Sequence, residues 1–423
     1  MLNNKNIFYK KKILIYGLGK SGLSVLRYLK KNNEITKYDD KIKVDNKKIT
    51  KIKFDYIIIS PGIDINKCKL SKFLKNNSKK IYTDLDIFYN HHKENSKITI
   101  TGTNGKSTTA KILYEIIKNH KVDVRLVGNI GNPVLFEKKV TNKTVFVIEA
   151  SSYQLEYSKL FKSNISLILN ISPDHLERHK TINRYVNAKF KLVKNQSKKD
   201  FAILNTKNFY IKKKLKSKNF LTKVIKIKKD VDNNFLRKIN NQYFNTDGNR
   251  ENLIFILEVA KILKLKKDIL IQTLKKFKGL KYRQEIVFQS KKLTIINDSK
   301  ATSFSSSASL LKSLTNVYWI VGGQAKKGDN LLLYRKNCKN FKAYIFGSNK
   351  SFFISKIKNL MEYESFLDLK SLIKRLFSEI NTSKKIIHKT IVFSPSAASF
   401  DNFKNFEKRG EYFNQLIKKY INA

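Results

Sequence analysis

The fold is decided by a short glycine-containing turn, Thr101-Gly102-Thr103-Asn104-Gly105-Lys106-Ser107-Thr108. An apolar strand is expected before it at 97–100, and a run with helical spacing follows it at 109–117. In such a turn backbone N–H groups approach phosphate oxygens, the helix N-terminus favours negative charge, Lys106 adds a cation and the Ser107 or Thr108 hydroxyl can bind Mg²⁺. We therefore predict a phosphate-binding loop at residues 102–108. The alternative is an ordinary strand-to-helix turn, which Gly-Lys-Ser-Thr at a helix start disfavours.

Short apolar strands and helical segments alternate along the chain. Strands are expected at 11–16, 54–59, 97–100, 145–148, 165–169, 293–296, 317–321, 343–346 and 390–393, and a helix at 23–29. Strands that are apolar throughout are typical of parallel sheets buried on both faces. The Lys-rich stretch 212–229 has no clear periodicity and is interpreted as solvated surface.

These patterns predict an α/β protein with three domains. They are a Rossmann-like domain at 1–92, a central P-loop ATPase-like parallel-sheet domain at 93–284, and a second Rossmann-like domain at 285–423.

The composition indicates a globular protein of a reducing compartment. The 423 residues are 41% hydrophobic and include only 4 Pro and 15 Gly, which leaves little room for long disordered linkers. Its 2 Cys lack the spacing of a metal site or a disulfide framework. Neither a signal peptide nor an apolar run of roughly 18 residues is apparent. We expect a cytoplasmic protein without a membrane span.

The net charge of +54 raises the possibility of a nucleic-acid-binding protein. The lysines are scattered through every segment, however, and no nucleic-acid-reading motif accompanies them. We therefore expect weak, nonspecific binding at low salt and no specific nucleic-acid partner.

The phosphate-binding loop resembles the ATP loop of the Mur ligase and folylpolyglutamate synthetase superfamily, which reads T-G-T-N-G-K-[ST]-[ST], and this resemblance implies that residues 102–108 bind ATP. The usual phosphate-loop pattern has a glycine where Ile100 stands, and Gly102 supplies the extra glycine here. Enzymes of this superfamily phosphorylate a carboxylate with ATP and then let an amine displace the phosphate. The resemblance thus implies an amide ligase.

Two further segments point to a metal site. Glu149 directly follows the strand 145–148, where its carboxylate could bind Mg²⁺, although an acid there is otherwise only a helix N-terminal charge. The segment 170–179 resembles the superfamily's N-[IV]-x-x-D-H-L-[DE]-R-[HY], which implies that His175 contacts a second metal and the acyl phosphate. The segment 185–189 resembles the one whose lysine is carbamylated. The resemblance therefore implies two Mg²⁺ ions, metal contacts from Ser107, Glu149, His175 and Lys189, and catalytic roles for Lys106, His175 and Lys189.

The N-terminal segment Gly17-Leu18-Gly19-Lys20-Ser21-Gly22 fits G-x-G-x-x-G, and Asp39 and Asp40 end the next strand. Alone, this pattern suggests NAD binding. It also resembles the turn with which the D-glutamate-adding branch of the Mur ligases holds the diphosphate of UDP. The resemblance to this branch implies that the UDP-linked substrate is contacted by Gly17, Leu18, Ser21, Asp39, Gly62, Asn129, Ser151 and Gln154.

The C-terminal third contains the most discriminating motifs. Asn297-Asp298-Ser299-Lys300-Ala301-Thr302 is similar to N-D-S-K-A-T of the same branch, and residues 394–410 match S-P-[AS]-x-A-S-x-D-x-F-x-x-[FY]-x-x-R-G. The resemblance implies D-glutamate contacts from Lys300, Thr302, Lys326, Ser399 and Phe406, and ATP contacts from Asn249, Arg283 and Asp298. The segments around Lys326 and Asn249 depart from the usual G-G-x-[DG]-K and G-x-H-N-x-x-N.

The resemblance as a whole implies an ATP-dependent ligase that adds D-glutamate to UDP-N-acetylmuramoyl-L-alanine in peptidoglycan synthesis. Its expected partners are small molecules, and the chain is expected to be a monomer. Another amide ligase of the superfamily, such as a folylpolyglutamate synthetase, is the alternative enzyme, and a basic nucleic-acid-binding protein is the alternative without catalysis.

Overall fold

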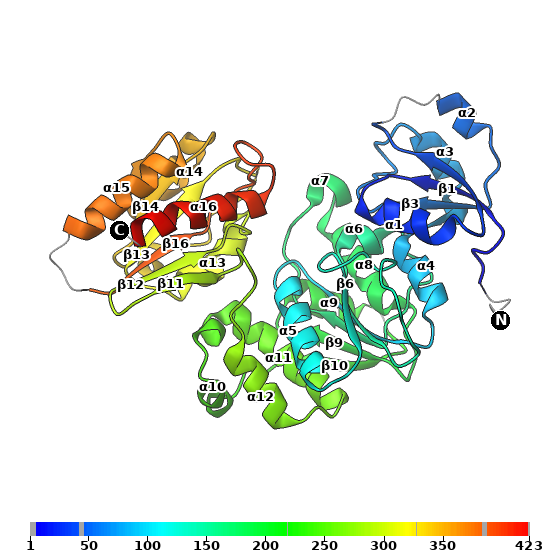
Figure 1. The fold of residues 1–423 in the computed structure, drawn as a ribbon, viewed down its shortest axis with the longest axis horizontal. Helices are drawn as coiled ribbons and strands as arrows, with labels where there is room; N and C mark the ends of the chain where they lie inside the picture. The colour runs from blue at the N-terminus through cyan, green and yellow to red at the C-terminus, as the bar shows by residue number, and fades with distance from the viewer. Residues whose placement is uncertain (1–5, 42–45, 218, 327, 383–386, 422–423) are drawn as a thin grey trace. The chain divides into compact units, whose positions relative to one another are not determined.

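The computed structural model describes residues 6–41, 46–217, 219–326, 328–382 and 387–421. In these residues the strands form three sheets, of four, six and six strands, with helices packed against them (Figure 1). This is the predicted α/β fold. Each strand expected from the sequence is present, with ends that shift by at most a few residues.

The first sheet has the strand order β2-β1-β3-β4, and its neighbouring strands run parallel. Alternate residues of β1 enter two different cores, Ile13 and Ile15 on one face and Leu14 and Tyr16 on the other, so both faces are covered. Its elements are β1 (Lys12–Tyr16), α1 (Lys20–Leu29), β2 (Glu34–Tyr38), α2 (Asn46–Thr50), β3 (Tyr56–Ile59), α3 (Ser71–Asn76), the 3₁₀ turn η1 (Ser78–Lys80), β4 (Ile81–Tyr82) and α4 (Asp84–His91).

The central sheet has the order β10-β9-β8-β5-β7-β6 and is parallel. Its strands are β5 (Ser96–Thr101), β6 (Val124–Gly128), β7 (Val145–Glu149), β8 (Ile165–Ile168), β9 (Phe201–Asn205) and β10 (Lys223–Ile227). The helices of this region are α5 (Lys106–Asn119), α6 (Ser152–Glu156), α7 (Leu176–His179), α8 (Ile182–Lys194), α9 (Phe209–Lys216), α10 (Asn233–Ile239), η2 (Gln242–Asn245), α11 (Asp247–Ile262) and α12 (Lys267–Lys276).

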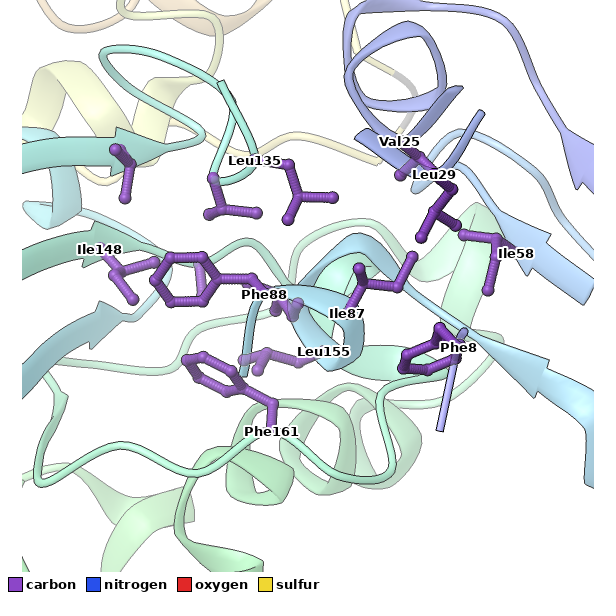
Figure 2. Packing of buried hydrophobic residues seen from close by; sticks show 14 of the residues in the cluster. Phe8, Val25, Leu29, Ile58, Ile87, Phe88, Leu135, Ile148, Leu155 and Phe161 are labelled. Carbon is purple, nitrogen blue, oxygen red and sulfur yellow. The ribbon is translucent and has the colours of Figure 1, made fainter. Parts of the chain in front are cut away.

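Helix α4 packs the first sheet against the central one. Its Ile87 and Phe88 belong to a single buried cluster that also contains Ile58 of β3 and Ile148 of β7 (Figure 2). The fully buried carboxylate of Asp86 on the same helix accepts backbone N–H groups from the segment 159–161. Apolar burial and a satisfied buried charge therefore fix this junction together.

The third sheet has the order β11-β12-β16-β13-β14-β15, in which β11 alone pairs antiparallel among the described strands. Trp319 and Val321 of β13 face a core with α13 and α14, whereas Tyr318 and Ile320 face one with α15 and α16. This alternation makes the sheet doubly wound. Its elements are β11 (Glu285–Gln289), β12 (Leu293–Asn297), α13 (Phe304–Lys312), β13 (Val317–Gly322), η3 (Arg335–Asn337), β14 (Lys342–Phe346), α14 (Lys350–Ile357), β15 (Glu362–Ser365), α15 (Leu369–Thr382), β16 (Lys389–Phe393) and α16 (Phe406–Ile421).

The chain divides into two compact units, Met1–Phe235 with Glu251–Leu274, and Leu236–Arg250 with Lys275–Ala423. Each of the three predicted domain ranges contains one of the sheets, but the boundaries at 92 and 284 stay predictions. Across the described residues, no helix combines the length and the apolar character needed to cross a membrane.

The Lys-rich stretch 212–229 has regular structure on both sides of residue 218 that the sequence did not indicate. It contains the end of α9 and the edge strand β10, whose Lys223 and Lys226 are exposed and whose Ile227 is buried. Lysines on an edge strand discourage pairing with other chains, and they also hide the alternation that identifies a strand.

Candidate active site

The predicted phosphate loop is a turn that requires glycine at its end. Gly105 precedes α5 with φ +83°, and a Cβ there would lie 2.2 Å from Oδ1 of Asn252. Lys106 Nζ donates to the carbonyl oxygen of Thr103 at 2.8 Å, and Thr103 N donates to the carbonyl oxygen of Asn170 at 2.9 Å. The loop is thus held in shape by the segment that follows β8, with its lysine at the start of a 14-residue helix, where an anion is favoured.

The structure brings together the predicted metal residues Ser107 and Glu149. Ser107 Oγ donates to Glu149 Oε2 at 2.6 Å, and Asn129 Nδ2 donates to Oε1 of the same carboxylate at 2.8 Å. Glu149 is only 1% exposed. A hydroxyl and a carboxylate oxygen held this close form the hard oxygen donor pair that Mg²⁺ prefers. Asn129, which the resemblance assigned to the UDP-linked substrate, orients this carboxylate.

Lys189 is buried beside the phosphate loop. Its Nζ donates to the carbonyl oxygen of Gly102 at 2.7 Å and lies 4.5 Å from the centre of the Tyr185 ring. Burial, and then the nearby charge of Lys106, holds the pKa of the Lys189 ammonium well below its usual range. An uncharged amine is the form that can react with CO₂, so the site is chemically suited to the predicted carbamate.

His175 stands at the N-terminus of α7 in the left-handed conformation, with φ +54°. Its Nδ1 lies 2.9 Å from Tyr153 Oη, and its Nε2 lies 3.4 Å from Asp174 Oδ2. Within the described residues no three or more His, Cys, Asp and Glu side chains group into a metal cage. Mg²⁺ commonly binds through one or two carboxylates and substrate phosphates, so the residues present fit such an ion.

The N-terminal glycine turn is closed by hydrogen bonds between its backbone and the side chains of Ser60 and Asp39. Gly17 has φ +94°, and its carbonyl oxygen accepts from Ser60 Oγ at 2.6 Å. Leu18 N donates to Asp39 Oδ2 at 2.7 Å, and this hydrogen bond lowers the pKa of the Asp39 carboxyl. The predicted UDP-contacting residues Gly17, Leu18 and Asp39 therefore meet at the carboxyl ends of β1 and β2, where open α/β sheets bind ligands.

The remaining predicted UDP contacts are spread over two sheets. Ser21 lies in the first turn of α1, and Gly62 follows β3 on an exposed turn. Ser151 and Gln154 form the capping box of α6, in which Ser151 Oγ accepts from Gln154 N. Their role in capping the N-terminus of α6 explains why these two residues are present here, and their contact with substrate stays a prediction.

In the second compact unit the predicted ATP residues are linked through Gln284. Asn249 Nδ2 donates to Gln284 Oε1 at 3.0 Å, and Gln284 N donates to Asp298 Oδ1 at 3.1 Å. Burial raises the pKa of Asp298 to about 7 even though Ser394 Oγ donates to it at 2.8 Å. Arg283 adjoins Gln284 in the chain, so all three predicted residues lie around one turn.

Two predicted D-glutamate residues, Lys300 and Phe406, are in direct contact, with the ammonium 3.9 Å from the ring centre. Arg409 is fully buried nearby and donates to the carbonyl oxygens of Ser299 at 2.8 Å and Ala397 at 2.9 Å. It thereby ties the segment before Lys300 to the segment that follows β16.

The other predicted D-glutamate residues lie on loops beside these. Gln324 N and Ala398 N each donate to the other residue's carbonyl oxygen at 3.0 Å, which joins the loop of Lys326 to the loop of Ser399. Ser399 is buried, whereas Thr302 is exposed. The second unit therefore presents a cation, an aromatic ring and hydroxyls at the carboxyl ends of its parallel strands.

A cavity of about 510 Å³ also lies in the second unit, along β11 and β12. Polar and apolar side chains line it, among them Gln242, Thr294, Ile296 and His388. None of the predicted D-glutamate residues contributes to its wall, so it is separate from that cluster.

Known proteins resemble this chain over almost its whole length. A Rickettsia bellii protein named UDP-N-acetylmuramoylalanine--D-glutamate ligase is 33% identical over 447 residues, which cover 97% of this chain and 98% of the relative. The chain belongs to the UDP-N-acetylmuramoylalanine--D-glutamate ligase family. A Francisella tularensis protein of the same name is 32% identical, with 96% of this chain and 95% of the relative covered. Residues 100–266 match the Mur ligase middle domain.

Solved structures of other Mur ligases share the fold of this member of the D-glutamate ligase family. UDP-N-acetylmuramate-alanine ligase of Thermotoga maritima matches with a TM-score of 0.58 at 16% identity, over 97% of this chain and 99% of the other. The MurF ligase of the same organism, solved in complex with ADP, matches with a TM-score of 0.57 at 15% identity, over 99% and 97% of the two chains.

Sequence reasoning missed several side chains that shape the site of this D-glutamate ligase family member. Tyr153 contacts His175, and buried Arg178 donates to Glu156 Oε2 at 2.9 Å and to the carbonyl oxygen of Ile63 at 2.6 Å. Arg178 lies in the motif at 170–179, and Tyr153 lies between the predicted residues Ser151 and Gln154, but only the folded arrangement of α6 and α7 reveals their partners. Arg409 also lies in a motif, at 394–410, but the sequence indicated no role for this arginine.

Proposed function

We propose that this chain joins D-glutamate to UDP-N-acetylmuramoyl-L-alanine in peptidoglycan synthesis, with ATP as the energy source. The observation that supports this most strongly is the phosphate loop at the start of α5, with Ser107 bonded to Glu149 at 2.6 Å, in a chain of this family. Phosphoryl transfer needs N–H groups that donate to phosphate oxygens, a lysine, and oxygen atoms that can bind a cation.

The first step is proposed to be phosphorylation of the substrate carboxylate. A carboxylate oxygen of the L-alanyl group attacks the γ-phosphorus of ATP, the bond to the β-phosphate oxygen breaks, and ADP leaves. Lys106 and the loop N–H groups stabilise the charge on the transferring group. Bound Mg²⁺, held by Ser107 and Glu149, would neutralise phosphate charge. The product of the step is an acyl phosphate.

The second step is proposed to be amide formation. The D-glutamate amine attacks the acyl carbon, and the tetrahedral intermediate collapses as phosphate leaves and the nitrogen loses its proton. Lys300 is suited to a side-chain or main-chain carboxylate of this dicarboxylic amino acid, since a cation pairs with a carboxylate. We assign Thr302, Lys326, Ser399 and Phe406 to the same substrate. Asn249, Arg283 and Asp298 are assigned to the nucleotide.

A carbamate on Lys189 is part of the proposal. The uncharged Nζ would form a bond to the carbon of CO₂ and release a proton, which converts a neutral amine beside the phosphate loop into an anion that can orient a metal. A high-resolution map of the active enzyme that shows a bare amine on Lys189 together with full Mg²⁺ occupancy would contradict this assignment.

Lys106→Ala tests the proposed function. We expect ADP-forming turnover to fall by roughly 10²-fold, since the variant loses a charge that stabilises the transition state. Lys111→Ala is a matched control, because Lys111 lies on the same helix and pairs with Glu115 at 2.6 Å. Equal ADP release by the two variants would contradict the role of Lys106.

The same assay separates the alternatives. A folylpolyglutamate synthetase would accept L-glutamate on a folate and would not need the UDP-sugar. A nucleic-acid-binding protein would bind nucleic acid in a salt-dependent way and release no ADP. We further propose a cytoplasmic, monomeric enzyme, and a dimer mass by light scattering would correct the second point.

A further inference from the structure

Tyr153, a residue of α6, contacts the ring of His175, which begins α7. The hydroxyl oxygen lies 2.9 Å from Nδ1, within the usual range of a hydrogen bond. Carboxylate oxygens of Glu177 and Asp174 lie 3.5 Å from Nδ1 and 3.4 Å from Nε2, outside that range. The Tyr153 hydroxyl is therefore the closest of these three groups to the imidazole.

The Tyr153 ring is itself held by two neighbouring side chains of α7. The Arg178 guanidinium lies 5.2 Å from its centre, and the His179 ring is stacked on it at 5.7 Å. Arg178 is in turn held by Glu156 Oε2. A hydroxyl on a ring clamped in this way has little freedom, so it can define the orientation of the imidazole it contacts.

The direction of the contact between Tyr153 and His175 depends on the histidine tautomer. The Tyr153 hydroxyl oxygen can accept the Nδ1–H of His175 while its own hydrogen points toward Glu177 Oε1, 3.4 Å away. With the proton on Nδ1, the lone pair is on Nε2, the nitrogen on the side of Asp174. Histidines that contact metals usually donate their other ring N–H to a neighbouring acceptor in this manner.

We propose that Tyr153 is a positioning residue for the ligation reaction, which accepts the Nδ1–H of His175 and so directs its Nε2 toward the reacting phosphate and cation. This inference rests on the proposed function, in which His175 contacts those groups. Tyr153 itself does not touch substrate and acts through His175.

Tyr157 provides a matched control within the same short segment. It also lies against the Arg178 guanidinium, with its ring centre 5.5 Å away, and it is partly buried like Tyr153. The Tyr153 hydroxyl is the one that contacts His175. Tyr153→Phe and Tyr157→Phe therefore remove the same atom from two rings around one arginine, and only the first removes the contact with the imidazole.

The first readout is the position of the imidazole proton, measured by nitrogen NMR on the full chain labelled in its 6 histidines, with Mg²⁺ and ADP added and with His175→Gln as the assignment control. We expect wild-type His175 to hold its proton on Nδ1 and Tyr153→Phe to shift it toward Nε2, the form that free histidine prefers. Tyr157→Phe should match the wild type. A proton on Nε2 in the wild type, or an unchanged ratio in Tyr153→Phe, would overturn the proposal.

The second readout is steady-state kinetics of ADP release. We expect Tyr153→Phe to lower kcat by about 10-fold, as loss of a group that orients a metal-contacting histidine does, with little change in KM for ATP. Tyr157→Phe should keep the wild-type kcat, and equal kcat values for the two variants would contradict the inference. The wild-type enzyme tests the proposed function separately. Absence of ADP release by the wild type would contradict the proposed ligase reaction, whereas the NMR result on the His175 proton would still stand. If Tyr153→Phe does not fold, the wild-type proton position alone decides.

Discussion

Lys189 and Asp298 are ionisable side chains that folding removes from water. Burial lowers the pKa of the first and raises the pKa of the second, so that the charged form of each is disfavoured. Such shifts are concentrated at functional sites, because chemistry there often needs the less usual protonation state. The sequence identified both positions through motifs, but their burial depends on segments far apart in the chain, such as Gly102 for Lys189 and Ser394 for Asp298.

The raised pKa of Asp298 predicts a pH dependence of stability. In the unfolded chain this carboxyl loses its proton near the ordinary aspartate pKa of 3.8, whereas in the folded chain it keeps the proton up to about pH 7. Between these values the unfolded chain binds fewer protons than the folded chain, so the free energy of unfolding should fall as pH rises through this window, by about 4 kcal/mol at most.

Asp298→Asn removes this titration. We expect the melting temperature of the wild type, relative to the variant, to fall between about pH 4 and pH 7 and then to level off. The exposed Glu407→Gln on α16 serves as the control and should follow the wild-type curve. Parallel curves for the wild type and Asp298→Asn would show that burial does not shift this carboxyl.

At the scale of elements, the strands that the sequence identified are largely apolar and buried. β7, β8 and β13 are nearly uninterrupted apolar runs, and their carboxyl ends were predicted together with the polar residues that follow. The edge strands β10 and β15 were missed because exposed lysine, glutamate and tyrosine obscure their pattern. The inner strand β9 was also missed, although it is buried to the same extent as β7. Side-chain partners such as Tyr153 with His175 were missed because they depend on how two short helices pack.

The glycine turn before α1 gives a test at this scale. A Cβ on Gly22 would lie 1.8 Å from the carbonyl oxygen of Gly17, whereas a Cβ on Gly19 would meet no atom within 4 Å. We expect Gly22→Ala to lower the free energy of unfolding by about 1–3 kcal/mol or more, because the backbone must move to relieve the overlap. Gly19→Ala should change it by less than about 1 kcal/mol.

Urea unfolding of the two alanine variants, followed by circular dichroism, makes this comparison. Equal stability of Gly22→Ala and Gly19→Ala would show that the turn does not have the close approach described here.

At the scale of the whole molecule, the predicted site residues fall in both compact units, so the proposed reaction uses residues of both. The phosphate loop, Glu149 and Lys189 belong to the first, and Asp298 and Lys300 belong to the second. The sequence supplied the motifs of both units, whereas the compact units divide the chain differently from the predicted domain boundaries, because 236–250 packs with the third sheet.

The net charge of +54 is a property of the whole chain and of no single site. It should give weak, salt-sensitive binding to nucleic acid without affecting the ligation chemistry.

ADP release by the purified chain, given ATP, Mg²⁺, UDP-N-acetylmuramoyl-L-alanine and one amino acid at a time, tests the central claim most directly. We predict ADP release in step with amide formation when D-glutamate is the amino acid, and little with L-glutamate. No ADP from the complete mixture, or equal rates with the two glutamate enantiomers, would contradict the proposed ligase function.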